Sequence, residues 1–198
     1  WRGDGRLIVV EPRRLAARAA AARIAWGLGE ETGCTVGYRV RNDTKVSAAT
    51  RIELVTAGVF VRMILDDPGL EGIAAVLFDE VHERALDMDL GLALALEAQG
   101  ALREDLRLLA MSATLDGRRF VDLLGGAPIV ESEGRLFPVE TQYLGSETGL
   151  RVEDRVARAV LKGLAEETGS ILAFLPGQGE IARTAERLEG KLPAGTIL

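Results

Sequence analysis

The sequence has little cysteine, histidine or aromatic side chain, and it has no long apolar run. Cys34 is the only cysteine and His82 is the only histidine among the 198 residues. A single cysteine excludes an internal disulfide and any cysteine-cluster metal site, and it is compatible with a reducing cytoplasm. No apolar run approaches the roughly 20 residues of a membrane-spanning helix, and we expect no signal peptide. These absences favour a cytoplasmic globular protein.

The residues that are present suit a protein with a substantial core. Hydrophobic residues make up 47% and charged residues 27% of the chain, as in ordinary globular domains. Aromatic residues make up only 5%, so the core must consist mainly of Leu, Val, Ile and Ala. The length fits one domain or one and a part. Because the chain starts at Trp1 and stops where the pattern predicts the beginning of a strand, at 196–198, we expect both ends to be cut.

The charge is distributed unevenly along the chain, although the net charge is -6. Residues 1–62 carry 11 Lys or Arg against 6 Asp or Glu, whereas the remainder carries 13 against 24. Basic groups concentrated in one third of the sequence are suited to a local phosphate-facing patch. They are more typical of solvated arginines on helix surfaces, and charge alone favours this second interpretation.

Apolar runs of strand length alternate with segments of helix length. The predicted strands are 6–10, 51–55, 73–78, 106–111 and 127–131, and the predicted helices are 15–28, 59–65, 90–99 and 116–124. This alternation predicts βαβ units and an α/β fold with a parallel sheet covered on both faces. An extended segment at 136–144, a helix at 152–167, a strand at 171–175 and a helix at 180–188 indicate the start of a second such unit. We therefore expect domains at 1–135 and 136–198.

Polar or turn residues follow four of the predicted strands. They are Glu11-Pro12-Arg13, Thr56-Ala57-Gly58, Asp79-Glu80 and Ser112-Ala113-Thr114. Parallel strands end at one edge of a sheet, and open α/β sheets bind ligands just outside those carboxyl ends. The sequence therefore predicts that the chemistry lies at this edge.

Two adjacent acids, Asp79 and Glu80, end the most apolar predicted strand. Carboxylates at such a position are costly unless a cation or hydrogen-bond donors compensate them. Mg²⁺ is a natural partner because it binds carboxylates together with phosphate oxygens. The alternative is that the acids cap the next helix. A zinc-protease motif is excluded because Leu86 stands where the second histidine would be, and a Cys34–His82 catalytic pair has no support in the sequence.

Five motifs occur in a defined order along the chain. They are P-R-R-x-A-A at 12–17, T-x-G-x-x-x-R at 56–62, D-E-x-H at 79–82, S-A-T at 112–114 and F-L-P-G-Q-G-E-I at 174–181. Together they resemble the superfamily 2 helicases of the DEAH/DExH type, and the segments 36–41 and 175–179 lean toward the bacterial HrpB-like branch. Val81 stands where DEAH proteins have Ala. The resemblance implies most of a first RecA-like domain, truncated at its N-terminus, and the start of a second.

The resemblance also implies a catalytic site for ATP and Mg²⁺. Asp79, with Glu80, would hold Mg²⁺ mostly through water, and Glu80 would activate the attacking water. His82 would contact the region of the γ-phosphate. Ser112 and Thr114 would couple hydrolysis to movement, although both could instead be simple helix caps.

A second implied site binds single-stranded nucleic acid, and the resemblance favours RNA over DNA without excluding DNA. The residues that the resemblance assigns to its backbone contacts are Arg13, Arg14, Thr56, Gly58 and Arg62. Contacts of this kind bind with little sequence preference.

Two motifs of the resembled helicases are missing from the sequence. The phosphate-binding loop G-x-x-x-x-G-K-[ST] occurs nowhere, and Leu192 follows the only Gly-Lys pair, Gly190-Lys191. The arginine-rich motif Q-x-x-G-R-x-G-R is also absent. We therefore expect an internal piece of an ATP-dependent helicase that by itself hydrolyses no ATP. The alternatives are a catalytically silent scaffold that binds nucleic acid or protein, and an ATPase that remodels protein–RNA complexes.

Overall fold

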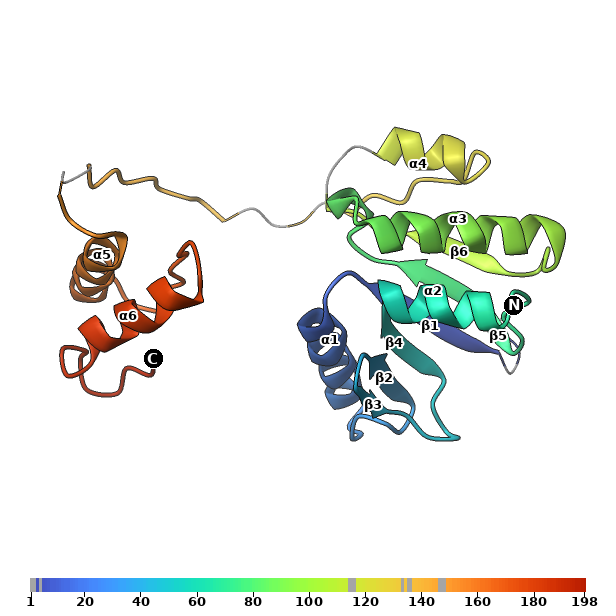
Figure 1. Cartoon of the computed structure of the whole chain (residues 1–198), viewed down its shortest axis with the longest axis horizontal. Helices are drawn as coiled ribbons and strands as arrows, with labels where there is room; N and C mark the ends of the chain where they lie inside the picture. Colours follow the sequence, from blue (N-terminus) through green and yellow to red (C-terminus); the bar gives the residue numbers. More distant parts are fainter. Residues whose placement is uncertain (1–2, 4, 114–116, 133, 135–136, 146–148) are drawn as a thin grey trace. The chain divides into compact units, whose positions relative to one another are not determined.

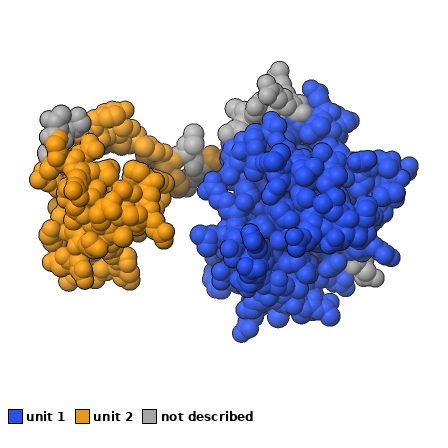
Figure 2. All heavy atoms as spheres, in the orientation of Figure 1, with its two compact units in different colours: residues 1–132 blue, residues 133–198 orange. Residues whose placement is uncertain are grey.

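The chain forms two compact units in the computed structural model, residues 1–132 and 133–198 (Figure 2). The structure describes residues 3, 5–113, 117–132, 134, 137–145 and 149–198. None of the helices within these ranges is long and apolar enough to cross a membrane.

The first unit is built on a six-stranded sheet with the order β3-β2-β4-β1-β5-β6 (Figure 1). The strands are β1 (Arg6–Glu11), β2 (Val36–Val40), β3 (Asp43–Lys45), β4 (Ile52–Thr56), β5 (Ile73–Phe78) and β6 (Arg107–Ala110). Among the described residues, only the short edge strand β3 is antiparallel to its neighbour, and the other strand pairings are parallel. This arrangement confirms the predicted α/β fold.

Helices cover both faces of the sheet, because successive side chains of a strand point to opposite faces. The helices of the first unit are α1 (Arg14–Gly27), α2 (Ala57–Asp66), α3 (Leu86–Ala101) and α4 (Gly117–Leu123). In β1, Ile8 and Val10 pack in the cluster of α2 and α3, whereas Val9 packs against the cluster of α1. Phe60 of α2 meets Phe78 of β5 edge to face, with ring centroids 5.4 Å apart.

Alanine lets α1 lie close to its face of the sheet. Ala17, Ala21 and Ala25 are buried at a spacing of four residues, which places them on one side of the helix. They pack with Tyr38 and Leu54 of the neighbouring strands. Small alanine side chains thus fill this interface, so the helix needs no large aromatic residues to pack on the sheet.

The structure corrects some of the predicted elements of the first unit. Strands at 6–10, 51–55, 73–78 and 106–111 and the four helices are confirmed, apart from small shifts at their ends. The strand predicted at 127–131 is wrong, because this segment pairs with no strand and exposes Ile129 and Val130. The strands β2 and β3 were not predicted, because Gly37, Arg39 and Lys45 interrupt their apolar pattern.

The second unit contains the helices α5 (Val152–Glu166) and α6 (Gln178–Leu188). The strand predicted at 171–175 is wrong for this structure, and 196–198 is not a strand either. A strand needs a neighbour to bond with, and the described residues of this unit contain no second strand. Accordingly, Leu172 and Phe174 are exposed.

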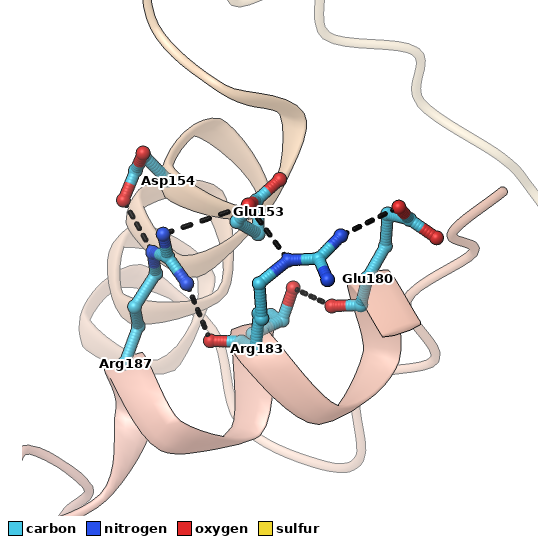
Figure 3. Close-up of polar contacts among 6 residues, drawn as sticks. Glu153, Asp154, Glu180, Arg183 and Arg187 are labelled. Carbon is cyan, nitrogen blue, oxygen red and sulfur yellow. Dashed lines mark hydrogen bonds and ion pairs between the residues drawn. The ribbon is translucent and has the colours of Figure 1, made fainter. Parts of the chain in front are cut away.

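Ion pairs join the two helices of the second unit (Figure 3). The carboxylate of Glu153, which is buried on α5, lies 3.0 Å from Arg183 and 3.5 Å from Arg187 of α6. Arg187 also pairs with Asp154, and Arg183 pairs with Glu180 at 2.6 Å. A buried carboxylate with two cationic partners is compensated, so this cluster fixes how α5 packs on α6.

Candidate functional site

The ends of the parallel strands bring the polar segments to one edge of the sheet. In the sheet register, Glu11 is paired with Thr56, Val10 with Phe78, and Phe78 with Ala110. The residues that follow these positions are therefore neighbours in space, although up to a hundred residues separate them in the sequence. Two regions lie along this edge, an acidic turn and a basic groove.

The acidic turn begins where β5 ends. The N–H of Asp79 donates to the carbonyl of Val10 at 2.9 Å, which continues the sheet by one residue. The carboxylate of Asp79 then accepts the N–H of Glu80 at 2.9 Å. Glu80 itself has φ 52° and ψ 38°, the left-handed region that non-glycine residues seldom adopt. Such strain, of order 1 kcal/mol, is typical of functional sites.

Glu11 adds a third carboxyl group to this turn. Glu11 is only 5% exposed, and its carboxyl group lies within hydrogen-bonding reach of Asp79. Burial, and then the negative charges of Asp79 and Glu80, raise the pKa of Glu11 from 4.5 to about 7. Sequence reasoning assigned Glu11 no role, and the available signal was its position at a polar strand end.

This crowding of acids is suited to a divalent cation. Three carboxyl groups that repel one another are stabilised when a cation lies beside them. Within the described part of the chain, no three or more His, Cys, Asp or Glu side chains are arranged to hold a metal ion by themselves. Mg²⁺ normally needs only one or two carboxylates, since phosphate oxygens and water complete its coordination. The residues present therefore fit Mg²⁺ bound together with a nucleotide.

His82 connects the acidic turn to the end of β6. Its Nδ1 lies 3.2 Å from Oε2 of Glu80 and 3.4 Å from Oγ of Ser112. The backbone supports this approach, because the N–H of Val81 donates to the carbonyl of Met111 at 3.1 Å. These contacts join the acidic turn to the segment after β6. Thr114, which was predicted to act with Ser112, lies outside the described residues.

The basic groove lies along the same edge and has a volume of about 1090 Å³. Its lining residues are Pro12, Arg14, Arg39, Val40, Arg41, Asn42, Thr56, Ala57, Gly58, Val59, Arg62, Met63, Asp66, Ala85, Leu86 and Asp87. Four of the five residues predicted to contact nucleic acid, Arg14, Thr56, Gly58 and Arg62, are among them. The fifth, Arg13, does not line the groove and pairs with Glu83 at 2.9 Å.

Sequence reasoning missed the wall of the groove formed by β2 and the turn after it. Arg39, Arg41 and Asn42 belong to this wall. The segment 36–41 carried the only available signal, a basic stretch in the basic third of the chain. Arg39 is fixed by the buried carboxylate of Glu53, with Nε 2.7 Å from Oε1. Arg6 pairs with the other oxygen of Glu53 at 3.4 Å.

The beginning of α2 also lines the groove. Thr56 is the N-cap residue, and its side chain makes no capping hydrogen bond to this end of the helix. Uncapped N–H groups and the helix dipole favour a bound phosphate. Gly58 keeps the space open, because a Cβ atom there would lie 3.1 Å from the carboxylate of Asp87. The groove is therefore suited to a phosphate backbone.

Comparison with known proteins supports the resemblance to DEAH/DExH helicases. The chain is 51% identical over 195 residues to the ATP-dependent RNA helicase HrpB of Escherichia coli, covering 98% of this chain and 24% of HrpB. It is 36% identical to the probable ATP-dependent RNA helicase DHX35 of Homo sapiens, covering 95% of this chain and 28% of that protein. No protein-family model matches the chain.

Solved structures agree with these sequence similarities. The crystal structure of the E. coli DEAH/RHA helicase HrpB superposes with a TM-score of 0.88 at 51% identity, covering 96% of this chain and 24% of that one. The predicted resemblance to DEAH/DExH helicases is thereby confirmed. The chain spans about a quarter of the length of these two relatives.

Proposed function

Because the chain is homologous to a segment of the DEAH/DExH-type RNA helicases, we propose that it is part of an enzyme that couples ATP hydrolysis to movement on single-stranded RNA. The observation that carries this proposal is the shared edge of the sheet, where an acidic turn and a basic groove lie side by side. A nucleotide and a nucleic acid bound there would contact the same short strand ends. Residues 1–135 would supply most of a first RecA-like domain, and 136–198 the start of a second.

In this proposal the acidic turn serves the nucleotide. Mg²⁺, when bound, would neutralise charge on the phosphates, and Asp79 would hold it mostly through water. Glu80 would accept a proton from the water that attacks the terminal phosphate. The left-handed backbone at Glu80 supports this role, because such strained conformations cluster at functional sites. His82, in contact with Glu80 and Ser112, would relay the state of the site.

The basic groove would hold the RNA backbone. Arg14, Arg39, Arg41 and Arg62 line the groove. Such contacts neutralise phosphates and read no bases, so affinity should vary little with sequence. It should fall steeply with salt, with a slope of about −0.7 in log K against log salt for each phosphate neutralised on a single strand.

The experiment that tests this proposal is a chimera. The 198 residues replace the homologous segment of E. coli HrpB, and RNA-stimulated ATP hydrolysis is measured. We expect the chimera to be active and the Glu80→Gln variant to lose activity while it retains RNA binding. A folded chimera that binds RNA but hydrolyses no ATP would favour a silent scaffold instead. Duplex unwinding by the active chimera would separate a helicase from an ATPase that only remodels protein–RNA complexes.

The isolated chain should hydrolyse essentially no ATP, because no phosphate-binding loop is present in its sequence. ATP turnover by the purified chain that RNA stimulates and Glu80→Gln abolishes would contradict this expectation.

A further inference from the structure

Only one of the two neighbouring arginines that follow β1 faces the groove. Arg14 lines it, whereas Arg13 points to Glu83 with Nη2 2.9 Å from Oε1. Both members of this pair remain accessible, since the side chain of Arg13 is 72% exposed and that of Glu83 is 31% exposed. Arg13, an exposed cation next to the groove, is thus paired with a carboxylate of the protein itself.

The acidic turn holds Glu83 in this position. Glu83 ends the short 3₁₀ turn Val81–Glu83, and its N–H donates to the carbonyl of Glu80 at 2.9 Å. The residues on both sides of the turn, Glu80 and Arg84, have left-handed backbones with φ 52° and 53°. Arg84 is in turn paired with Asp89 at 2.9 Å. The carboxylate that pairs with Arg13 therefore belongs to the same short turn as the proposed catalytic glutamate.

The pair between Arg13 and Glu83 is weak enough to be displaced. It consists of a single contact in solvent, and exposed pairs of this kind change an equilibrium by about fivefold at most. An RNA phosphate that approaches Arg13 would meet two opposing effects, attraction by the guanidinium and repulsion by the carboxylate beside it. Because the two charges of the pair cancel at a distance, Arg13 contributes little to the field of the groove while it is paired.

We propose that Glu83 competes with RNA phosphates for Arg13 and so keeps the affinity of the chain for RNA below what its arginines would allow. This inference rests on the proposed binding of RNA in the groove and adds a residue that regulates it. Neutralising Glu83 or moving its turn would release Arg13 to take up one further phosphate. The turn of the nucleotide site would thereby control one contact of the RNA site.

The test measures binding of the 198-residue chain to a fluorescent single-stranded RNA by anisotropy over a series of salt concentrations. We expect Glu83→Gln to bind about two to five times more tightly than the wild type at low salt. The slope of log K against log salt should steepen by about 0.7, the value for one additional phosphate on a single strand. Glu83→Asp, which keeps the charge, should bind like the wild type.

Two further variants separate competition from a general charge effect. Glu104→Gln removes one negative charge before β6, at the opposite edge of the sheet, and should leave the slope unchanged. Arg13→Gln alone should change the slope little, and it should abolish the gain in the Arg13→Gln/Glu83→Gln double variant. The inference is overturned if Glu83→Gln binds no better than the wild type, or if its gain persists without Arg13. If neither the wild type nor any variant binds RNA, the proposed function fails, and this inference fails with it.

Discussion

Replacing Glu11 with Gln should make the first unit more stable at alkaline pH and should change little in acid. Glu11 is buried beside Asp79 and Glu80, and its pKa is raised to about 7. In the folded protein it therefore retains a proton at pH values where the unfolded chain has released it. Gln has nearly the same shape, carries no charge, and can donate its amide N–H to Asp79 in place of the carboxyl proton.

The expected magnitude follows from the two pKa values. Because the pKa of Glu11 is raised in the folded protein, its proton stabilises the fold. This contribution to the free energy of unfolding is fully present below pH 4.5, the pKa in the unfolded chain, and is lost as the pH rises through about 7. Each tenfold difference in proton affinity corresponds to about 1.4 kcal/mol, so the full loss is about 3 kcal/mol above pH 7. The stability of Glu11→Gln relative to the wild type should therefore increase by about 2–3 kcal/mol between pH 5 and pH 8.

The assay is urea denaturation of both proteins at pH 5, 6, 7 and 8, followed by tryptophan fluorescence. Both tryptophans, Trp1 and Trp26, belong to the unit of residues 1–132, so the signal reports on that unit. Other titrating groups are common to both proteins and cancel in the difference. A difference that stays constant from pH 5 to pH 8 would refute the reasoning, because a purely steric effect of Gln does not depend on pH.

Three further predictions concern the framework around the sites. Arg103→Ala should destabilise the first unit by about 2–3 kcal/mol, because the Arg103 guanidinium donates to the carbonyls of Gly69, Leu70 and Ile73. Urea denaturation measures this loss, and an unchanged midpoint would contradict the role of Arg103. Gly37→Ala should lower the free energy of unfolding by about 1–3 kcal/mol in the same assay, since the added Cβ would lie 2.4 Å from the Lys45 carbonyl oxygen. A variant as stable as the wild type would show that β3 can move away from this atom. The pKa of Glu153 is lowered by its backbone N–H and by Arg183, so the second unit should lose helix content, measured by circular dichroism, as the pH falls below about 4.5. Glu153→Gln should be less stable than the wild type at neutral pH and should lack this acid-dependent loss.

The elements that the sequence predicted correctly are those in which local pattern and tertiary environment agree. The apolar runs at 6–10 and 73–78 are strands because their residues are buried on both faces of a parallel sheet, as such runs predict. The segments 127–131 and 171–175 have similar composition and are not strands. The residue types of a segment show only how well it suits a strand. To become a strand, the segment also needs a neighbouring strand with which to form hydrogen bonds.

The same distinction holds at the candidate site. The motif Asp79-Glu80-Val81-His82 and the basic first third of the chain were recognisable because they are contiguous in the sequence. The contacts of Glu11 with Asp79 and of Arg13 with Glu83 join residues that are far apart in the sequence. No local pattern reports such a pairing, because it depends on which strands become neighbours in the sheet.

The sequence by itself determined the alternation of strands and helices, the residue types at the strand ends, and the resemblance to DEAH/DExH helicases. Only the tertiary structure decided that Arg39 and Arg41 form a wall of the groove, that Glu11 shares the acidic turn, and that Arg13 is paired away from the groove. The physical reason is that side-chain types and periodicity are local properties of a chain. The charge that a given side chain faces is set by the order and register of strands, which folding alone establishes.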